Sequence, residues 1–335
     1  MQIITDISLF DKTQWKLFVE NHPEGNFFQS PNAYEFFTSV AYYKPLIIIA
    51  IENNEILGLL LAVIVKEGKS IKGFLSSRCI VWGGPLVISQ NIEVYSKLLE
   101  TLDLLVRKNV IYIEFRNFYN LAFSSEIFSK FQYKYSDHLN IILSLKECDI
   151  EGALLKMTYN RRREIKQSLK LEATVSEAES IDEIRSLYNI LHSLYNKEVK
   201  LPLPSFSFFQ RIYESKYGKV FIVKHKSNII GGSFCFISSR TIYTLYYCGN
   251  KSYRKNIYPS HLAIYAPIKY ATENRLINVD LMGAGKPNEK YGVREYKKQF
   301  GGDLVNYGRF IRINKKLLYS ACKIGLKLYR SLKKV

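Results

Sequence analysis

Asp280 occupies a position that suggests chemistry, because it ends an apolar strand just before Met282-Gly283-Ala284-Gly285. A carboxylate at the carboxyl end of a strand is able to take a proton from an attacking group or to orient that group. An aspartate that caps the following turn is an equally good interpretation. A Gly-x-Gly pair alone is a weak signal for a phosphate loop. The glycines therefore indicate a tight turn or a close approach of substrate.

Arg161 lies in a basic segment that is predicted to be helical. At 100° per residue, one stripe of this helix is largely apolar and faces inward, and the opposite side is basic. Arg161 falls on the inward stripe, and a buried guanidinium needs an anionic partner. That partner is either a core carboxylate or a substrate phosphate. The outward side is a solvated face or a contact for a nucleic acid backbone. The inward stripe is Leu154, Thr158, Arg161, Ile165 and Leu169, and the outward side carries Arg163, Lys166 and Lys170.

The cysteines and histidines argue against two common kinds of catalytic centre. The five cysteines are scattered without a CxxC pair, which predicts reduced thiols rather than a disulfide framework. The five histidines form no HxxxH or HExxH pair, so we expect no metal site. No local motif supports a Ser-His-Asp or Cys-His arrangement, and a covalent intermediate is not expected.

Length and composition predict two domains and no membrane span. A chain of 335 residues that is 47% hydrophobic is too long for one ordinary core. Its first residues lack the basic and apolar regions of a signal peptide. The longest apolar run, Ile56 to Val65, is about half of the roughly 20 residues that a spanning helix needs. We expect a cytoplasmic protein.

The formal net charge of +18 predicts an anionic partner, and much of the excess lies at the end of the chain. No acidic residue follows Asp303, whereas nine lysines and arginines do. Residues 311–335 read as a basic amphipathic helix, which favours contact with the inner face of the plasma membrane. Docking of the apolar half onto the first domain is the alternative. That half comprises Leu317, Leu318, Ala321, Cys322, Ile324, Gly325, Leu328, Tyr329 and Leu332.

An internal repeat sets the expected architecture. Residues 47–60 and 220–233 both read as a β-hairpin and align without a gap, so that Gly58 falls on Gly231. Further along the chain, both units have an amphipathic helix followed by a strand that carries one acidic residue. This order pairs Glu114 with Asp280. Each unit is predicted to be a mixed sheet, rich in hairpins, with helices packed on it. The expected fold class is therefore α/β in the broad sense, with the mixed sheets of α+β proteins. We place the units at 1–149 and 150–310, followed by the helix 311–335.

Four segments in order resemble the FemAB-like (BioF2-like) branch of the GNAT acyltransferase superfamily. They are NFFQSPNAYEFF (26–37), VWGGPLV (81–87), KMTYNRRREIKQSLK (156–170) and DLMGAGKPNEKYGVREYKKQFGG (280–302). The most specific piece, GVREYKKQFGG, is similar to the signature Gly-x-x-x-Phe-Lys-x-x-Phe-Gly, with Tyr296 in the usual Phe position. The resemblance implies two tandem GNAT-like domains.

The resemblance also implies transfer of an acyl or aminoacyl group to an amine on an amino sugar or cell-surface glycan precursor. Acyl-CoA or aminoacyl-tRNA would serve as co-substrate, with no tightly bound cofactor and with tRNA or a lipid-linked acceptor as partners. Two departures from the family pattern restrict the donor and the type of enzyme that the resemblance implies. The segment YRKNIYPSHLAIY lacks the glycines of the usual pyrophosphate loop, and the long helical arm of some peptidoglycan-bridge enzymes is missing between His192 and Phe209. A catalytically inert GNAT-like module bound to a membrane surface or RNA is the alternative.

By the same resemblance, Lys297 at the signature lysine is the candidate cation for the developing oxyanion. A surface lysine in a basic cluster is the alternative interpretation. Ser260 follows Pro259 as a possible helix N-cap in the degenerate loop. Aromatic side chains suited to a sugar or acyl pocket are Tyr246, Tyr247, Tyr253 and Trp82, although core packing is the favoured interpretation. Catalytic candidates are thus Lys297 and Asp280, and substrate-binding candidates are Arg161, Trp82, Tyr247, Arg254, Ser260, Lys286, Tyr291 and Arg294.

Overall fold

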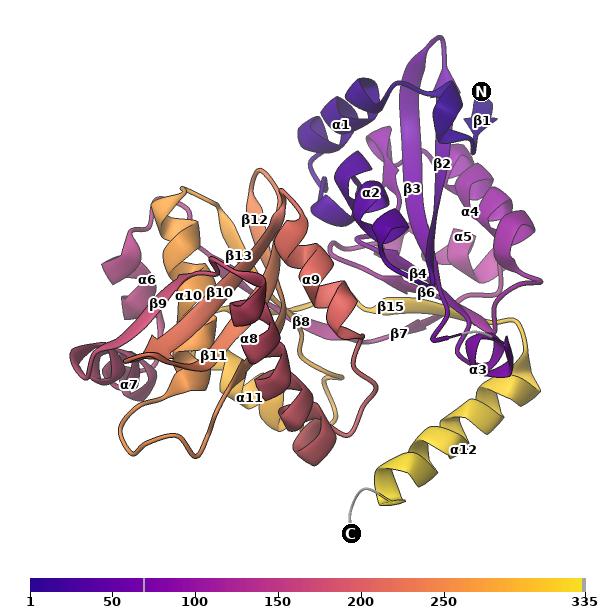
Figure 1. The fold of residues 1–335 in the computed structure, drawn as a ribbon. Helices are drawn as coiled ribbons and strands as arrows, with labels where there is room; N and C mark the ends of the chain where they lie inside the picture. Colours follow the sequence, from indigo (N-terminus) through magenta and orange to yellow (C-terminus); the bar gives the residue numbers. More distant parts are fainter. Residues whose placement is uncertain (69, 333–335) are drawn as a thin grey trace. The chain divides into compact units, whose positions relative to one another are not determined.

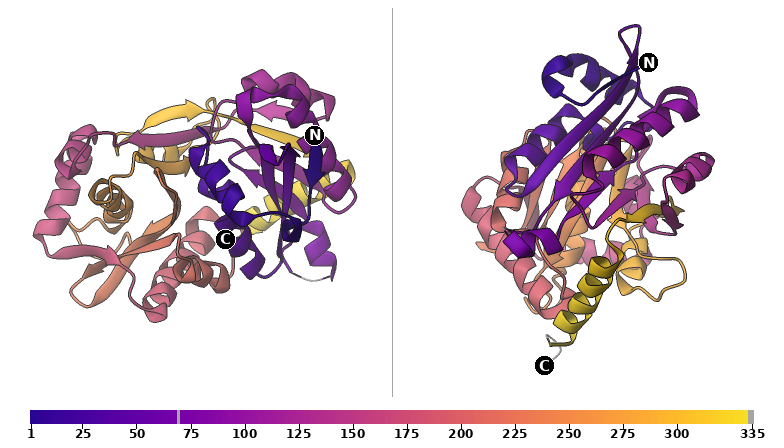
Figure 2. Two further views of the ribbon diagram at one scale, coloured as in Figure 1. Left: turned by 90° about the horizontal axis from the view of Figure 1, so that it is seen from above. Right: turned by 90° about the vertical axis from the view of Figure 1, so that its right-hand side faces the viewer.

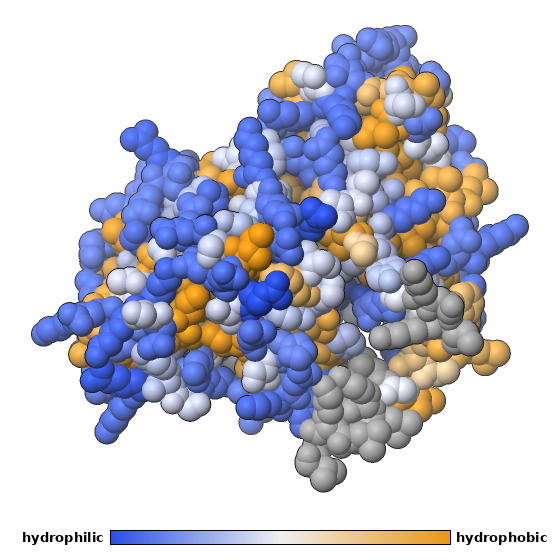
Figure 3. All heavy atoms as spheres, in the orientation of Figure 1, coloured by the Kyte–Doolittle hydropathy of each residue, from blue (hydrophilic) through white to orange (hydrophobic). Residues whose placement is uncertain are grey.

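A computed structural model describes residues 1–68 and 70–332, and the chain forms two compact units. The first contains residues 1–138 and 306–332, and the second contains residues 139–305. Each unit is a mixed sheet with helices on its faces (Figure 1). The face of the molecule drawn in Figure 3 is mainly hydrophilic and is interrupted by apolar patches. No helix in the described ranges is long and apolar enough to cross a bilayer.

The sheet of the first unit has the strand order β1-β2-β3-β4-β6-β15-β7, with β5 beside β3. Strand β3 is almost entirely apolar and buried, and the apolar face of α4 packs on it. The elements are β1 (Gln2–Ile4), α1 (Lys12–Asn21), α2 (Pro31–Ser39), β2 (Tyr43–Glu52), β3 (Glu55–Val65), α3 (Ser70–Leu75), β4 (Arg78–Trp82), β5 (Leu86–Val87), α4 (Ile92–Val106), β6 (Tyr112–Arg116), α5 (Ser125–Lys130), β7 (Lys134–Ser136), β15 (Arg309–Ile313) and α12 (Lys316–Leu332).

The sheet of the second unit has the order β14-β8-β13-β12-β11-β10-β9, with α10 packed on β11 and β12. In the view from above, α10 lies between the sheet and helices α6 and α7 (Figure 2). The elements are β8 (Leu139–Ser144), α6 (Ile150–Lys156), α7 (Tyr159–Lys170), β9 (Ala173–Glu177), α8 (Ile181–Leu194), α9 (Phe206–Glu214), β10 (Gly218–His225), β11 (Asn228–Ile237), β12 (Thr241–Gly249), α10 (Pro259–Glu273), β13 (Asn278–Gly283), α11 (Gly292–Lys298) and β14 (Asp303–Asn306).

The predicted duplication is present in strand pairing as well as in element order. Hairpins β2–β3 and β10–β11 form as expected, and their tight turns use positive φ at Asn53, Asn54 and Lys226. Glu114 pairs with Ile80 on a parallel neighbour and with Ile311 on an antiparallel one. Asp280 has the same two kinds of neighbour in β12 and β8. The two acidic residues therefore occupy equivalent sheet positions.

Strands β8 and β15 do not fit the unit boundaries that the sequence pattern predicts. Strand β8 falls within the range expected for the first unit but pairs with β13 of the second. Strand β15 straddles the expected boundary at residue 310, so residues 311–313 are strand and not helix, and it pairs with β6 and β7 of the first unit. Hydrogen bonds between strands so distant along the chain leave no local pattern, which is why the expected boundaries differ from the observed units.

The expected arginine-rich helix is divided into α6 and α7 by extended backbone at Met157 and Thr158. Of its predicted inward stripe, Leu154, Arg161 and Ile165 are buried and Leu169 is half-buried, but Thr158, at the break, is exposed. The three basic residues of the outward side, Arg163, Lys166 and Lys170, are exposed.

The C-terminal helix α12 is attached to the first unit by part of its surface. Tyr319 packs edge-on against Tyr112 at 5.4 Å between ring centroids, and the Cys322 thiol donates to the Leu75 carbonyl at 3.1 Å. In contrast, Leu317 is 88% exposed and Ile324 is 60% exposed. The contacts of Tyr319 and Cys322 thus favour docking of the helix on the first unit, whereas the exposed Leu317 and Ile324 favour an uncovered apolar stripe. The side chains of Leu328, Tyr329 and Leu332 lie outside the described part of the chain.

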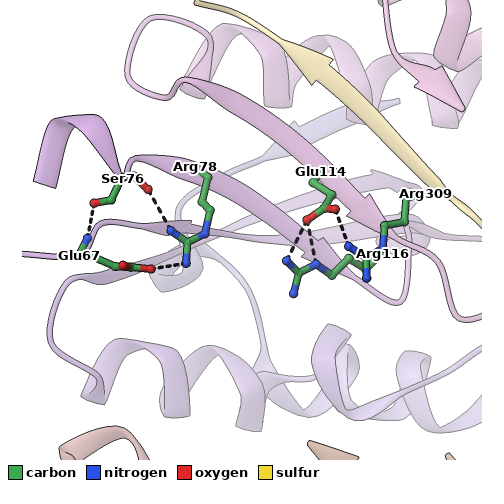
Figure 4. Close-up of polar contacts among 6 residues, drawn as sticks. All are labelled: Glu67, Ser76, Arg78, Glu114, Arg116 and Arg309. Carbon is green, nitrogen blue, oxygen red and sulfur yellow. Dashed lines mark hydrogen bonds and ion pairs between the residues drawn. The ribbon is translucent and has the colours of Figure 1, made fainter. Parts of the chain in front are cut away.

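Glu114 is a buried carboxylate held by two arginines of the first sheet (Figure 4). Arg116 Nε donates to one of its oxygens at 2.9 Å, and Arg309 Nη1 donates to the other at 2.7 Å. Burial alone would raise the pKa of Glu114, but the two guanidinium charges and their hydrogen bonds lower this pKa to about 2. The Glu114 carboxylate is therefore charged throughout the physiological pH range.

We expect the Glu114→Gln substitution to lower the free energy of unfolding by about 3 kcal/mol at pH 7. The folded-state pKa of about 2 is below the ordinary value of 4.5, so the stabilisation is present above that value and is lost as the pH falls toward 2. Urea unfolding of both proteins at pH 7, 5 and 4 measures this. A difference that stays constant over this range would contradict the assigned pKa.

Candidate active site

Lys297 lies in the last turn of the short helix α11, and its side chain is buried against strand β13 at 6% exposure. Its ammonium donates to the Leu281 carbonyl at 2.5 Å and to the Gly283 carbonyl at 3.0 Å. A lysine ammonium has three donors, so these two carbonyls leave one for a further acceptor. This geometry favours a held internal cation over the alternative of a solvated surface lysine.

Burial sets the charge state of Lys297 and of its neighbour Asp280. Desolvation lowers the pKa of Lys297 to about 8, against the opposing effect of the Asp280 charge. Asp280 is 2% exposed, and burial raises its pKa to about 6 although hydrogen bonds and Lys297 act in the other direction. At pH 7 both groups are predominantly charged. Each group changes its protonation state about one pH unit away from pH 7.

Asp280 also shapes the turn that Lys297 contacts. Its Oδ1 accepts from the Met282 amide at 2.6 Å, and its Oδ2 accepts from Asn140 Nδ2 at 3.4 Å. Met282 has φ of +61°, an unusual conformation for a non-glycine residue. The turn-capping interpretation of Asp280 is thus the arrangement observed. The capped turn presents the Leu281 and Gly283 carbonyls to the ammonium.

Aromatic rings surround the lysine. Tyr247, near the end of β12, stacks on Tyr296 of α11 with 6.2 Å between ring centroids and 11° between planes. Lys297 Nζ lies 5.8 Å from the centroid of the Tyr247 ring. Tyr195, in a π-helical turn after α8, packs against Tyr246, and burial raises the pKa of Tyr195 to about 12. The Tyr247 ring excludes water from one side of the ammonium.

The sheet itself opens beside this cluster. Strand β12 pairs in parallel with β13 from Thr241 to Tyr243, and it then runs on to Gly249. A β carbon on Gly249 would lie 2.3 Å from the Ser260 amide nitrogen, so the end of β12 lies directly against the first turn of α10. A Gly249→Ala chain could not keep this approach. The helix begins at Pro259 with Tyr258 as its N-cap, so the expectation that Ser260 is the N-cap is wrong.

Arg161 joins this cluster from α7. Its guanidinium lies 4.8 Å from the Tyr296 ring centroid and 5.1 Å from that of Phe300. It donates to Gln299 at 2.6 Å and to Glu164 at 3.3 Å. Its Nε atom is buried without a partner among the described residues. The carboxylate alternative is therefore met in part, by a glutamate on the same helix.

His261, in the first turn of α10, is in contact with Arg161 and stacks on Tyr258 at 5.0 Å. Desolvation and the adjacent Arg161 charge lower the pKa of His261 to about 3. The imidazole is thus neutral at physiological pH, and the positive charge at this place belongs to Arg161. A histidine one hundred residues from its partner gave no signal in the sequence, so this residue was missed.

The remaining candidates have other surroundings. Arg294 is buried and donates to the carbonyls of Lys286 and Glu289 at 2.5 Å each, so it braces the loop after β13. Lys286 is exposed and pairs with Glu289 at 3.8 Å. Tyr291 is partly exposed over Gly285, where φ is +75° and a β carbon would lie 2.9 Å from its ring.

Arg254 and Trp82 have surroundings of their own. Arg254 is exposed in the loop between β12 and α10. Trp82 belongs to the first unit, where it stacks on Phe37 at 5.3 Å and has the Arg116 guanidinium 5.5 Å from its ring centroid. The structure thus brings together Lys297, Asp280 and Tyr247, with Arg161 joined to them through Tyr296. In the described ranges, no three His, Cys, Asp or Glu side chains are grouped to hold a metal ion.

No protein-family model and no curated protein sequence matches the chain. Solved structures do match over nearly its full length. FemX is 15% identical with a TM-score of 0.74, covering 96% of this chain and 99% of its own. A tandem GNAT protein from the clavulanic acid biosynthesis pathway is 8% identical with a TM-score of 0.61, covering 93% and 98%. L-PGS from Bacillus licheniformis is 16% identical with a TM-score of 0.58, covering 95% and 97%. The protein therefore has the FemAB-like tandem GNAT fold.

Proposed function

We propose that this chain is an N-acyltransferase or aminoacyltransferase whose reaction centre is Lys297. The acceptor amine attacks the carbonyl carbon of an activated donor, and a C–N bond forms as the C–S bond of a thioester or the C–O bond of an ester breaks. The amine loses a proton, and the departing thiolate or alkoxide takes one up. The observation that carries the proposal is a buried ammonium, fixed by two backbone carbonyls in an acyltransferase fold, with one donor left over.

In this proposal Lys297 donates its third N–H to the oxyanion that develops on the donor carbonyl. Negative charge at that oxygen forms beside a fixed cation with little water, where a single donor contributes roughly 3–4 kcal/mol. Asp280 acts as a positioning residue, because its Oδ1 holds the Met282 amide in the turn that orients Lys297, and its Oδ2 is itself held by Asn140 of β8. Tyr247 forms the wall against which the acyl group lies.

Arg161 and the first turn of α10 are proposed to recognise the phosphate of the donor. A helix N-terminus carries partial positive charge, and the guanidinium beside His261 adds a full one. Arg254, in the loop preceding α10, and Ser260, in its first turn, would supply outer contacts. This segment lacks glycines, so side chains as well as amides would meet the phosphate.

The acceptor is proposed to be an amine on an amino sugar or cell-surface glycan precursor. Helix α12 favours a lipid-linked form of it, because the exposed Leu317 and Ile324 lie on a helix with lysines and no acidic residue. Flotation with phosphatidylglycerol vesicles tests this placement at the cytoplasmic membrane face. Leu317→Glu is expected to reduce the floated fraction, whereas Leu104→Glu, at a leucine on α4 that is 80% exposed, is not. Equal flotation of all three proteins would remove the membrane from the proposal.

The donor is tested by titrating acetyl coenzyme A and an aminoacyl-tRNA separately against the purified chain. Saturable binding of one, followed by transfer to glucosamine or a lysyl peptide amine, identifies the donor class. Arg163→Gln serves as a control for loss of one exposed charge, and Arg161→Gln is expected to weaken donor binding about tenfold. If neither donor binds or is consumed, the transferase proposal is wrong and the inert binding module becomes the better interpretation.

A further inference from the structure

Asn140 lies on strand β8, directly beside the strand that carries Asp280, and its side chain is buried at 8% exposure. The pairing of β8 with β13 is interrupted there, because Asp280 lies opposite Ile142 whereas Gly283 lies opposite Asn140. Three steps along β13 thus match two steps along β8, which makes this a β-bulge. Met282, inside the bulge, has φ of +61°. A bulge changes the direction of the side chains and carbonyls next to it.

The contacts of Lys297 are built on this bulge. Its ammonium donates to the carbonyls of Leu281 and Gly283, the two residues that flank Met282. The Met282 amide in turn donates to Asp280 Oδ1 at 2.6 Å. A hydrogen bond to an ionised carboxylate is stronger than one to a neutral acceptor. The shape of the bulge, and with it the direction of the ammonium, therefore depends on Asp280 keeping its charge.

Side chains from three elements interact with the Asp280 carboxyl group. Lys297 comes from α11, Tyr243 from β12 as the register partner of Asp280, and Asn140 from β8. Asn140 Nδ2 donates to Oδ2, the oxygen that the Met282 amide does not use, at 3.4 Å. Burial raises the pKa of Asp280 to about 6, and the Met282 amide, the Lys297 charge and the Asn140 amide act in the other direction. Burial also raises the pKa of Tyr243, so this phenol stays neutral.

We infer that Asn140 is a positioning residue of the Lys297 centre, because its amide stabilises the charged Asp280 that shapes the bulge. A neutral donor suits this place, since it supports the carboxylate without adding a cation. A second positive charge beside Lys297 would lower the pKa of the lysine further and leave less ammonium at neutral pH. The inference rests on the proposed role of Lys297. It adds to that centre a residue that lies 140 positions before Asp280 in the chain.

The pH dependence of acyl transfer separates this role from a purely structural one. Asn140→Leu is similar in size but lacks the donor, so Asp280 is expected to take up its proton at a higher pH. The acid limb of the rate is expected to move toward neutral pH by about one unit, whereas the alkaline limb of Lys297 stays in place. Asn140→Asp is expected to move the acid limb further, because adjacent carboxylates raise each other's pKa.

Ser144→Ala is the control for these variants, since Ser144 is exposed on the same strand. It is expected to move neither limb. A loss of rate in Asn140→Leu that is equal at every pH would leave Asn140 with a packing role only and would overturn the inference. An acid limb that stays in place in both Asn140 variants would overturn it as well.

Urea unfolding tests the same residue without a transfer assay. The folded-state pKa of Asp280, about 6, is above the ordinary value of 3.8, so its contribution to stability is present at low pH and is lost as the pH rises through about 6. Asn140→Leu is expected to extend this loss to higher pH. The urea midpoint of the variant should therefore lie further below that of wild type at pH 7.5 than at pH 5.

The two measurements also separate this inference from the proposed function. A difference in urea midpoint that is the same at pH 5 and pH 7.5 would refute the role of Asn140, even in a chain that transfers acyl groups through Lys297. The expected change of that difference with pH, in a chain without detectable transfer, would support the action of Asn140 on Asp280 and count against the proposed function alone.

Discussion

Replacing Lys297 by methionine is expected to lower kcat/KM for acyl transfer by about 10²–10³-fold. Methionine keeps the length and apolar stem of the side chain while removing its charge and donors. The Leu281 and Gly283 carbonyls lose their shared partner, but the turn keeps its hydrogen bonds through Asp280. Donor binding measured separately is expected to change much less than the rate, because the contact is made in the transition state.

Lys298→Met is the matched control for this change. Lys298 is the next residue on α11, but it is exposed and lies 3.7 Å from Glu295 on the same helix. Its replacement is expected to leave the transfer rate within twofold of wild type. Thermal unfolding of both variants separates loss of catalysis from loss of structure. A folded Lys297→Met chain that transfers as fast as wild type would sink the assignment.

The pH dependence of the rate provides a second measurement of the same residue. The lowered pKa of Lys297 means that its ammonium loses its proton as the pH rises through about 8, and the rate is expected to fall there. Asp280 gains a proton as the pH falls through about 6, which weakens the turn and lowers the rate on the acid side. The residual activity of Lys297→Met is expected to lack the alkaline limb. An alkaline limb that persists unchanged belongs to another group.

Ending the chain at Val305 is expected to abolish folding of the first unit, although residues 1–138 remain present. Strand β15 would be missing from between β6 and β7, and Phe310, stacked on Phe128 with 4.0 Å between ring centroids, would leave the core. Glu114 would also lose Arg309. An unpaired strand edge and a buried carboxylate lacking one of its two partners are both costly. Size-exclusion chromatography and limited proteolysis report the outcome.

A chain ending at Asn314 is the control for that truncation. It retains β15 (Arg309–Ile313) and removes α12 with the residues that flank it. We expect it to purify as a folded protein with protease resistance like that of the full chain. A folded first unit in the chain ending at Val305 would show that β15 adds little. Failure of both truncated chains would instead make α12 the essential element.

The sequence predicted the parts of the fold that depend on local patterns. The two hairpins, the equivalence of Glu114 with Asp280 and the inward orientation of Arg161 all follow from periodicities within about fifteen residues. Membership of β8 and β15 in their sheets did not follow, since it depends on pairing with strands far away in the chain. The preference of a segment for strand structure depends on the side chains packed across from it, so its composition alone does not say which sheet it joins.

Within the candidate site, the sequence was better at singling out residues than at predicting what each of them does. Lys297, chosen by the family resemblance, and Asp280, chosen by its place at a strand end, interact with each other, and the turn-capping role of Asp280 was one of two interpretations left open. Arg294 had the right chemistry for substrate binding, but the structure uses it to hold the Lys286 and Glu289 carbonyls. His261 and Asn140 were missed because their partners, Arg161 and Asp280, are at least 100 residues away.

The placement of β15 has a consequence for synthesis on the ribosome. Strands β6 and β7 emerge early, but the strand that belongs between them is translated only after the whole second unit, since Ile313 follows Ser136 by 177 residues. At about 5–20 residues per second, the gap lasts roughly 10–35 s. The second unit, contiguous from 139 to 305, can complete its sheet first. The unit made first would therefore be finished last, and its open edge would be the part of the nascent chain most in need of protection by a chaperone.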